Sequence, residues 1–126
     1  MVKEISSNSA FSLLNTINDS ILIDVRTKVE LQEFGVASVP IILFIEYDSS
    51  HESYFIDLVK QKINNKNISI FIICRSGKRS LNAAKLMEKN GYKNCYNIED
   101  GMEGSSIEAG WIRNNLPHNF LGDYAK

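Results

Sequence analysis

The segment Cys74–Ser80, with the sequence CRSGKRS, combines a thiol with three positive charges and a glycine. Four apolar residues lead into the cysteine, and a helical pattern begins at Arg79. A helix N-terminus offers free backbone N–H groups and the positive end of its dipole. Gly77 allows a tight turn in which successive N–H groups point inward. All of these features favour a negative charge on sulfur, so the segment predicts a reactive Cys74 thiolate.

Such a thiolate needs no histidine base to act as a nucleophile at neutral pH. The same N–H groups would suit a persulfide, which is also anionic, and they would bind an oxyanion donor. The alternative is that Cys74 is a small core residue at the end of an apolar strand and that the cations are merely solvated. The glycine, the three cations and the following helix together favour the reactive cysteine.

The elements that must position this segment alternate between apolar runs of strand length and helical patterns. Strands that are apolar at nearly every position are typical of a parallel sheet covered by helices on both faces. Ligands bind such sheets beyond the carboxyl ends of the strands, where Cys74 is placed. The predicted strands are Ile21–Val25, Ile41–Ile45, Ile68–Cys74 and Asn94–Ile98; the predicted helices begin at Ser7 or Asn8 and cover Lys28–Phe34, Tyr54–Ile63 and Arg79–Asn90, with a short helix around Trp111.

The 126 residues fit one domain over residues 1–126. A net charge of −1 gives no overall attraction for nucleic acid or an anionic membrane. The N-terminus lacks the apolar core of a signal peptide, and the longest apolar runs are far short of a membrane span, so we expect a cytoplasmic protein. There, Cys74 and Cys95 are expected to be thiols, and their spacing predicts neither a metal site nor a cofactor.

The segment Cys74–Ser80 resembles the active-site loop of the single-domain rhodanese-like sulfurtransferases, in which a cysteine is followed after four residues by arginine and a helix. Leu22–Arg26 is similar to that family's hydrophobic–Asp–Val–Arg strand end, with Glu30 at the spacing of its next acidic residue. Gly91–Met102 resembles the family's stretch that contains two adjacent glycines, with Asp100 in place of the first. Trp111 and Leu116-Pro117 match its usual ending, so that the likeness spans roughly residues 5 to 117.

The resemblance implies a three-layer α/β fold, with a central five-stranded parallel sheet flanked by helices on both faces. It also implies a reaction in which Cys74 attacks the outer sulfur of a small anionic donor such as thiosulfate and becomes a persulfide. The sulfur then passes to a thiophilic acceptor: cyanide, a thiol or a protein. By this resemblance, the backbone of the loop would hold the transferred sulfur, and the cations of the loop would hold the donor. The implied substrate-binding residues are Arg75, Ser76, Gly77, Lys78, Arg79 and Ser80.

Four residues near these motifs have open or secondary interpretations. Asp24 has two possible roles: it orients a neighbouring group, which is the loop amides or Arg26, or it caps a nearby turn. Arg26 either lines the mouth of the site or forms a structural ion pair. We expect Glu30 to pair structurally. Cys95 is either a core residue or a resolving thiol for Cys74.

Two rival functions are open. Phosphatases of related fold also use a Cys…Arg loop, but they place five residues between Cys and Arg, whereas four separate Cys74 from Arg79; the shorter loop suits a single sulfur better. A non-catalytic rhodanese-like binding module is the second rival, although such modules usually lack the cysteine. The chain departs from the family's G-H-I-P-G-A turn at Gly35–Pro40 and carries a polar stretch at Tyr47–Ser53, and both changes bear on the mouth of the site.

Overall fold

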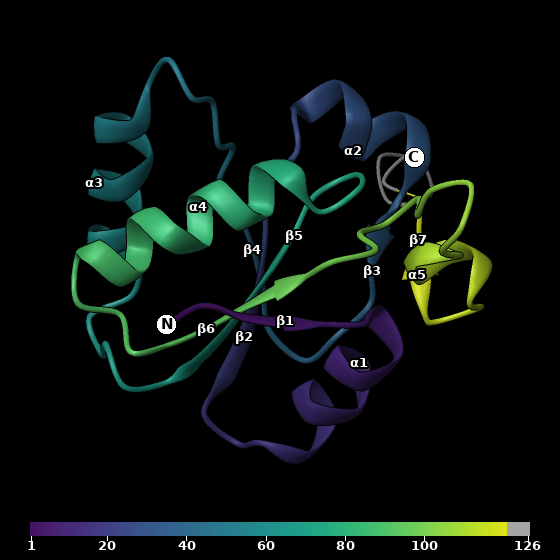
Figure 1. The fold of residues 1–126 in the computed structure, drawn as a ribbon, viewed down its shortest axis with the longest axis horizontal. Coiled ribbons are helices and arrows are strands. Elements are labelled where there is room, and N and C mark those ends of the chain that lie inside the picture. Colours follow the sequence, from purple (N-terminus) through teal and green to yellow (C-terminus); the bar gives the residue numbers. More distant parts are fainter. Residues whose placement is uncertain (121–126) are drawn as a thin grey trace.

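A five-stranded, fully parallel sheet forms the centre of the computed structural model, which describes residues 1–120 (Figure 1). Its strand order is β1-β6-β5-β2-β4. The last six residues of the predicted 1–126 domain lie outside the described part of the chain. The predicted α/β fold with a five-stranded parallel sheet is confirmed. The strands are β1 (Lys3–Ile5), β2 (Ser20–Asp24), β4 (Ile42–Phe44), β5 (Ser69–Ile73) and β6 (Asn94–Ile98).

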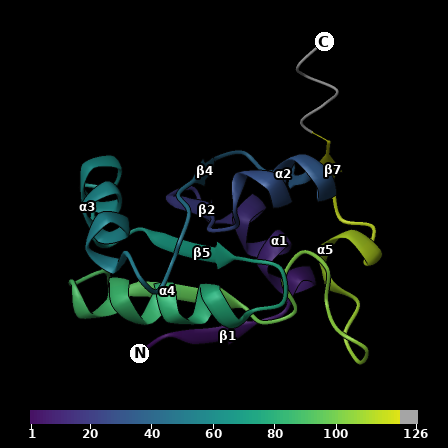
Figure 2. The ribbon, with the colours of Figure 1, turned by 90° about the horizontal axis from the view of Figure 1, so that it is seen from above.

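Helices cover both faces of this sheet, as Figures 1 and 2 show. On one side lie α3 (Glu52–Lys62) and α4 (Lys78–Lys89), and on the other α1 (Ser7–Thr16) and the short α5 (Gly110–Arg113). Successive strand residues point to opposite faces: in β2, Ile21 and Ile23 pack in the core with α3 and α4, whereas Leu22 packs in the core with α1 and α5. Burial on both faces is the reason that the strands are apolar runs rather than alternating patterns.

The helix α2 (Lys28–Phe34) has the bounds that the sequence predicts. Thr27 Oγ1 accepts the N–H of Glu30, and Glu30 Oε1 accepts the N–H of Thr27, so the helix begins with a complete capping box. Gly35 ends it with a φ of 80°. None of the helices within residues 1–120 is both long and apolar enough to cross a membrane.

Other boundaries differ from the prediction by one or two residues. The helix α3 begins at Glu52 rather than Tyr54, and the Glu52 carboxylate accepts the hydroxyl of Tyr47 at 2.5 Å, which ties the first turn to the preceding loop. The helix α4 begins at Lys78 rather than Arg79, because Gly77 already serves as its N-cap.

Three short strands were not located from the sequence pattern. The edge strand β1 has only three residues, of which Lys3 and Glu4 are exposed, so it carries no apolar run. The strands β3 (Val36–Ala37) and β7 (His118–Asn119) form a separate antiparallel pair of two residues each. Trp111 is fully buried and donates its Nε1–H to the carbonyl of Pro117 at 2.8 Å, which fixes the C-terminal segment against the core.

Candidate active site

Cys74 directly follows β5, the central strand of the sheet, and its side chain is buried. The loop from Cys74 to Gly77 connects this strand to α4. In Figures 1 and 2 it projects beyond the carboxyl end of β5, on the side of the molecule where α2 and α5 lie. The candidate nucleophile therefore lies where parallel sheets bind their ligands.

Two backbone N–H groups point at the sulfur. The N–H of Gly77 donates to Cys74 Sγ at 3.1 Å and that of Ser80 at 3.4 Å, and Ser80 Oγ lies 3.1 Å from the same sulfur. Gly77 has a φ of 95°, and a Cβ there would overlap the backbone carbonyl of Glu99. Only glycine fits this position without strain, and the geometry it permits favours an anionic sulfur at the N-terminus of α4.

The end of β6 and the segment after it donate hydrogen bonds to the carbonyls of the loop. Met102 donates its N–H to the carbonyl of Cys74 at 2.9 Å, and Glu103 donates to that of Arg75 at 3.0 Å. Asn97, in β6, donates its Nδ2–H to the carbonyl of Gly77 at 3.1 Å. With its carbonyls bonded on this side, the loop is free to direct N–H groups toward the sulfur.

Two of the three predicted anion-binding cations are paired with carboxylates. Arg79 donates from both terminal nitrogens to Glu30, at 2.7 Å each, and these hydrogen bonds lower the pKa of Glu30 to about 2. Arg75 Nε lies 3.2 Å from Glu103 Oε1. Lys78 is exposed, and within residues 1–120 no carboxylate lies within ion-pair distance of it.

Among the predicted substrate-binding residues, Gly77 and Ser80 are hydrogen-bonded to the sulfur, and the other four are not. Ser76 is exposed on the loop. The substrate-binding roles of all six residues therefore stay a prediction.

Asp24 and Arg26 form a buried ion pair at the carboxyl end of β2. Both oxygens of Asp24 accept from the Arg26 guanidinium, with the shortest bond at 2.8 Å, and Asp24 Oδ1 also accepts the N–H of Arg26. Arg26 Nη2 donates further to the carbonyl of Gly35 at 2.7 Å. Because Arg26 is only 1% exposed, the structure favours the structural ion pair over a place at the mouth.

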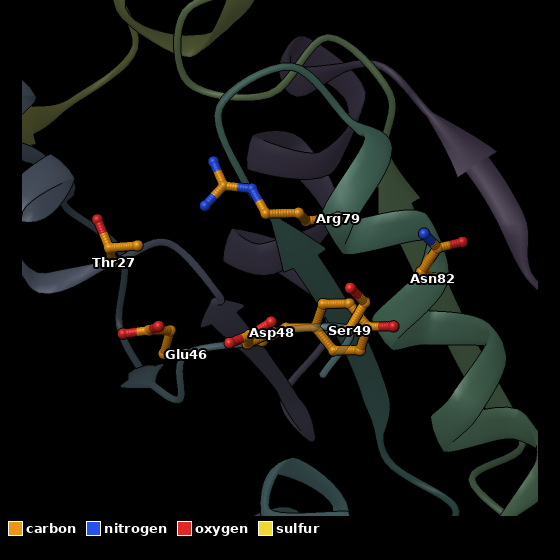
Figure 3. Close-up of a pocket in the computed structure, with 7 residues that line it drawn as sticks. Thr27, Glu46, Asp48, Ser49, Arg79 and Asn82 are labelled. Carbon is orange, nitrogen blue, oxygen red and sulfur yellow. The ribbon is translucent and has the colours of Figure 1, made fainter. Parts of the chain in front are cut away.

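A cavity of about 320 Å³ opens beside Arg79 (Figure 3). In the figure the guanidinium of Arg79 reaches from α4 toward Thr27, while Glu46 and Asp48 lie along the opposite part of the pocket. Three of the seven residues in the polar stretch 47–53 thus line this pocket. The complete lining is Thr27, Glu46, Tyr47, Asp48, Ser49, Arg79 and Asn82.

Cys95 lies too far from the carboxyl end of the sheet to act as a resolving thiol for Cys74. It is paired with Ile70, four residues before Cys74, which places it about 13 Å away along the strand direction. It is buried, and burial raises the pKa of its thiol to about 11. Of its two interpretations, the structure supports the core residue.

Two polar residues of the site region, Asn97 and Glu4, were not predicted from the sequence, nor were the contacts of Asp100. Asn97 and Glu4 are hydrogen-bonded to each other although 93 positions separate them. Asp100, which replaces a glycine of the family motif, accepts from the N–H and hydroxyl of Ser7 and so fastens the start of α1 to the end of β6. Asn97 lies inside the Gly91–Met102 motif, which was the one signal that could have singled it out. Within residues 1–120, no three His, Cys, Asp or Glu side chains come together as a metal site.

Comparison with known proteins shows the family of this chain. Residues 3–121 match the family model described as the STR4 middle domain. A rhodanese-like domain protein from Staphylococcus aureus has a similar solved structure, with 27% identity and a TM-score of 0.60 over 81% of this chain and 89% of that one. The chain belongs to the rhodanese-like sulfurtransferase family.

Two further similarities extend over nearly the whole length. The uncharacterized protein RP600 of Rickettsia prowazekii (strain Madrid E) is 38% identical over 125 residues, which cover 95% of this chain and 99% of that protein. The crystal structure of Rv0390 from M. tuberculosis has a TM-score of 0.82 at 26% identity and covers 93% of this chain and 96% of its own. Both similarities thus extend over nearly the full length of the compared chains.

Proposed function

We propose that this protein is a sulfurtransferase that carries a sulfane sulfur as a persulfide on Cys74. The observation that carries the proposal is the buried Cys74 sulfur at the start of α4, which receives backbone N–H groups from Gly77 and Ser80. Donors of this kind stabilise an anionic sulfur without requiring a base or a metal. Membership of the rhodanese-like family supports the same chemistry.

The reaction has two steps. In the first, the Cys74 thiolate attacks the outer sulfur of thiosulfate; a bond forms between the two sulfurs, and the bond to the oxidised sulfur breaks, so that sulfite leaves with the electron pair. In the second, a thiolate or cyanide attacks the outer sulfur of the Cys74 persulfide. The sulfur–sulfur bond then breaks, and the Cys74 thiolate is restored.

The ion pair between Arg79 and Glu30 favours sulfur transfer over phosphoryl transfer. A phosphatase loop uses its arginine to hold the phosphoryl oxygens through two parallel hydrogen bonds. Both terminal nitrogens of Arg79 donate to Glu30, so Arg79 would have to leave Glu30 to present this end of its guanidinium to a phosphoryl group. The short spacing of four residues between Cys74 and Arg79 also suits one sulfur atom rather than a tetrahedral group.

The charges around the site bear on its substrates. Lys78 is exposed on the loop and is available to a small anionic donor, whereas the exposed Arg75 is ion-paired with Glu103. Glu46 and Asp48 in the pocket beside Arg79 make that side acidic, which suits an uncharged thiol or a protein thiol as acceptor. Both cysteines are free, and we place the reaction in the cytoplasm, where thiols stay reduced.

The test is intact mass before and after incubation with thiosulfate, followed by cyanide. We expect a gain of one sulfur atom in the wild type and in the matched control Cys95→Ala, its removal by cyanide, and no gain in Cys74→Ser. A gain that survives in Cys74→Ser, or the absence of any gain with thiosulfate, polysulfide or a protein persulfide on a folded chain, would reject the proposal. The second result would favour a binding module.

A further inference from the structure

A chain of hydrogen bonds runs from Cys74 through Ser80 and Asn97, which are buried, to the exposed Glu4 on β1. Ser80 Oγ lies 3.1 Å from Cys74 Sγ and 2.5 Å from Asn97 Oδ1. Both Ser80 and Asn97 are buried, so water does not supply other partners. Because a hydroxyl has a single proton, Ser80 can donate to only one of its two neighbours at a time.

The orientation of the Asn97 amide decides which neighbour receives that proton. Asn97 Nδ2 donates to Glu4 Oε1 at 2.5 Å and to the carbonyl of Gly77 at 3.1 Å. The opposite amide orientation would place an oxygen against these two acceptors, so Oδ1 must face Ser80, where it can only accept. The Ser80 proton therefore lies toward Asn97, and Ser80 Oγ presents its lone pairs to Cys74.

We infer that Asn97 is a positioning residue for the sulfur-transfer cycle. Because the Ser80 proton is bonded to Asn97, the Ser80 hydroxyl can accept a hydrogen bond from the Cys74 thiol but cannot donate one to the Cys74 thiolate. The inference rests on the proposed function. The backbone N–H groups of Gly77 and Ser80 still stabilise the thiolate, but a third donor is kept from it.

The consequence differs among the three states of the cysteine. The thiol donates its proton to Ser80, so the whole chain of hydrogen bonds is satisfied. In the persulfide the charge lies on the outer sulfur, so Ser80 stays bonded to Asn97. Asn97 thus destabilises the thiolate selectively, which makes it a stronger nucleophile toward the donor and a poorer leaving group during delivery.

Other charged groups lie on the loop and on the elements around Cys74. The loop and the first turn of α4 contribute Arg75, Lys78 and Arg79, of which the first and last are ion-paired. The carboxylates and the buried cation from the other elements are Glu4 on β1, Asp24 and Arg26 at the end of β2, Glu30 on α2, and Glu99 and Glu103 after β6. Substitutions at Ser80 and Asn97 leave all of these charges in place, so a comparison of such variants isolates the hydroxyl proton.

The experiment is a pH titration of the ultraviolet absorbance of the Cys74 thiolate, in a Cys95→Ala background and without any sulfur donor. A Cys74→Ser sample of the same background serves as the blank for tyrosine ionisation. We compare Asn97→Ala, Ser80→Ala and the double variant, with Asn94→Ala, on the same strand, as the matched control. Thermal unfolding of each variant checks that it is folded.

In Asn97→Ala the Ser80 hydroxyl is free to donate to sulfur, so the midpoint of the titration should move about one pH unit lower, the effect of one hydrogen bond to a charged group. In Ser80→Ala the midpoint should stay or move lower. Adding Asn97→Ala to Ser80→Ala should change it by less than about 0.3 of a unit. Asn94→Ala should leave it unchanged.

Three results would overturn the inference: no change in folded Asn97→Ala, a rise of the midpoint in Ser80→Ala, or an Asn97→Ala effect that persists without the Ser80 hydroxyl. The rise would mean that the hydroxyl donates to the thiolate. The persistent effect would mean that Asn97 acts through Gly77 alone. If Asn97→Ala does not fold, the sign of the Ser80→Ala change decides. Because the titration needs no sulfur donor, its outcome is separate from that of the persulfide test.

Discussion

Replacing Glu30 by Gln should destabilise the protein at neutral pH and much less in acid. Glu30 and Arg79 join α2 to the first turn of α4, across the mouth of the pocket. Glutamine can keep the capping hydrogen bonds to Thr27 through its oxygen, but it removes the charge and replaces the oxygen that accepts from Arg79 Nη2 with a donor. The pair to Arg79 lowers the pKa of Glu30 from its ordinary value of 4.5 to about 2, which corresponds to an upper bound of about 3 kcal/mol. Since Arg79 is 34% exposed, solvent screening reduces this to about 1–2 kcal/mol.

The sign of the pH dependence follows from the direction of that pKa change. A carboxyl whose pKa is lower in the folded state stabilises the fold above its unfolded pKa, near 4.5, and this contribution is lost as the pH falls toward 2. At pH 3 only about 40% of it should remain. Urea unfolding at pH 7 and pH 3 measures the difference between the wild type and Glu30→Gln.

The matched control for this experiment is Glu33→Gln, which makes the same charge change at an exposed position of the same helix. It should change the free energy of unfolding by less than about 0.5 kcal/mol at both pH values. Equal effects of Glu30→Gln and Glu33→Gln at pH 7, or a Glu30→Gln effect as large at pH 3 as at pH 7, would refute the reasoning.

Three further outcomes are expected. Gly77→Ala should lower the rate of persulfide formation about 10- to 100-fold, because its Cβ would overlap the Glu99 carbonyl and move the N–H away from Cys74 Sγ; an unchanged rate would contradict this. Cys95→Ala should cost about 1 kcal/mol in urea unfolding and leave sulfur loading unchanged, and slower loading would contradict its place in the core. The pair Glu46→Gln and Asp48→Asn should lower the KM for thiosulfate about threefold at low salt and have no effect at high salt; a KM that does not respond to salt would show that these carboxylates do not face the donor.

Local signals predicted the parts of the fold that local interactions determine. The helix α2 was predicted to the residue because Thr27 can cap its start and Gly35 can end it. The strand β6 was predicted with the same bounds that the structure has. The strand β1 was missed because its stability comes from pairing with β6, more than ninety positions away, and not from an apolar run of its own.

The candidate site divides in the same way. The segment Cys74–Ser80 contains the candidate nucleophile, the glycine and the helix start, and all three are predicted by a local pattern. The same pattern suggested three free cations, but two of them are paired with Glu30 and Glu103, at positions that only the fold brings near. Spacing shows which charges a loop carries, whereas tertiary structure determines which of them remain available to a substrate.

The arrangement of the loop N–H groups around the Cys74 sulfur depends on segments outside the loop. A backbone can direct its N–H groups at a sulfur only if its carbonyls have other partners, since buried carbonyls without partners are costly. In this protein the carbonyls of Cys74, Arg75 and Gly77 are bonded by Met102, Glu103 and Asn97, all from the end of β6 and the turn after it. Gly101 allows that turn to approach, because a side chain there would overlap the carbonyls of Cys74 and Arg75. The motifs at Cys74–Ser80 and Gly91–Met102 are therefore two halves of one site, in which the second orients the first.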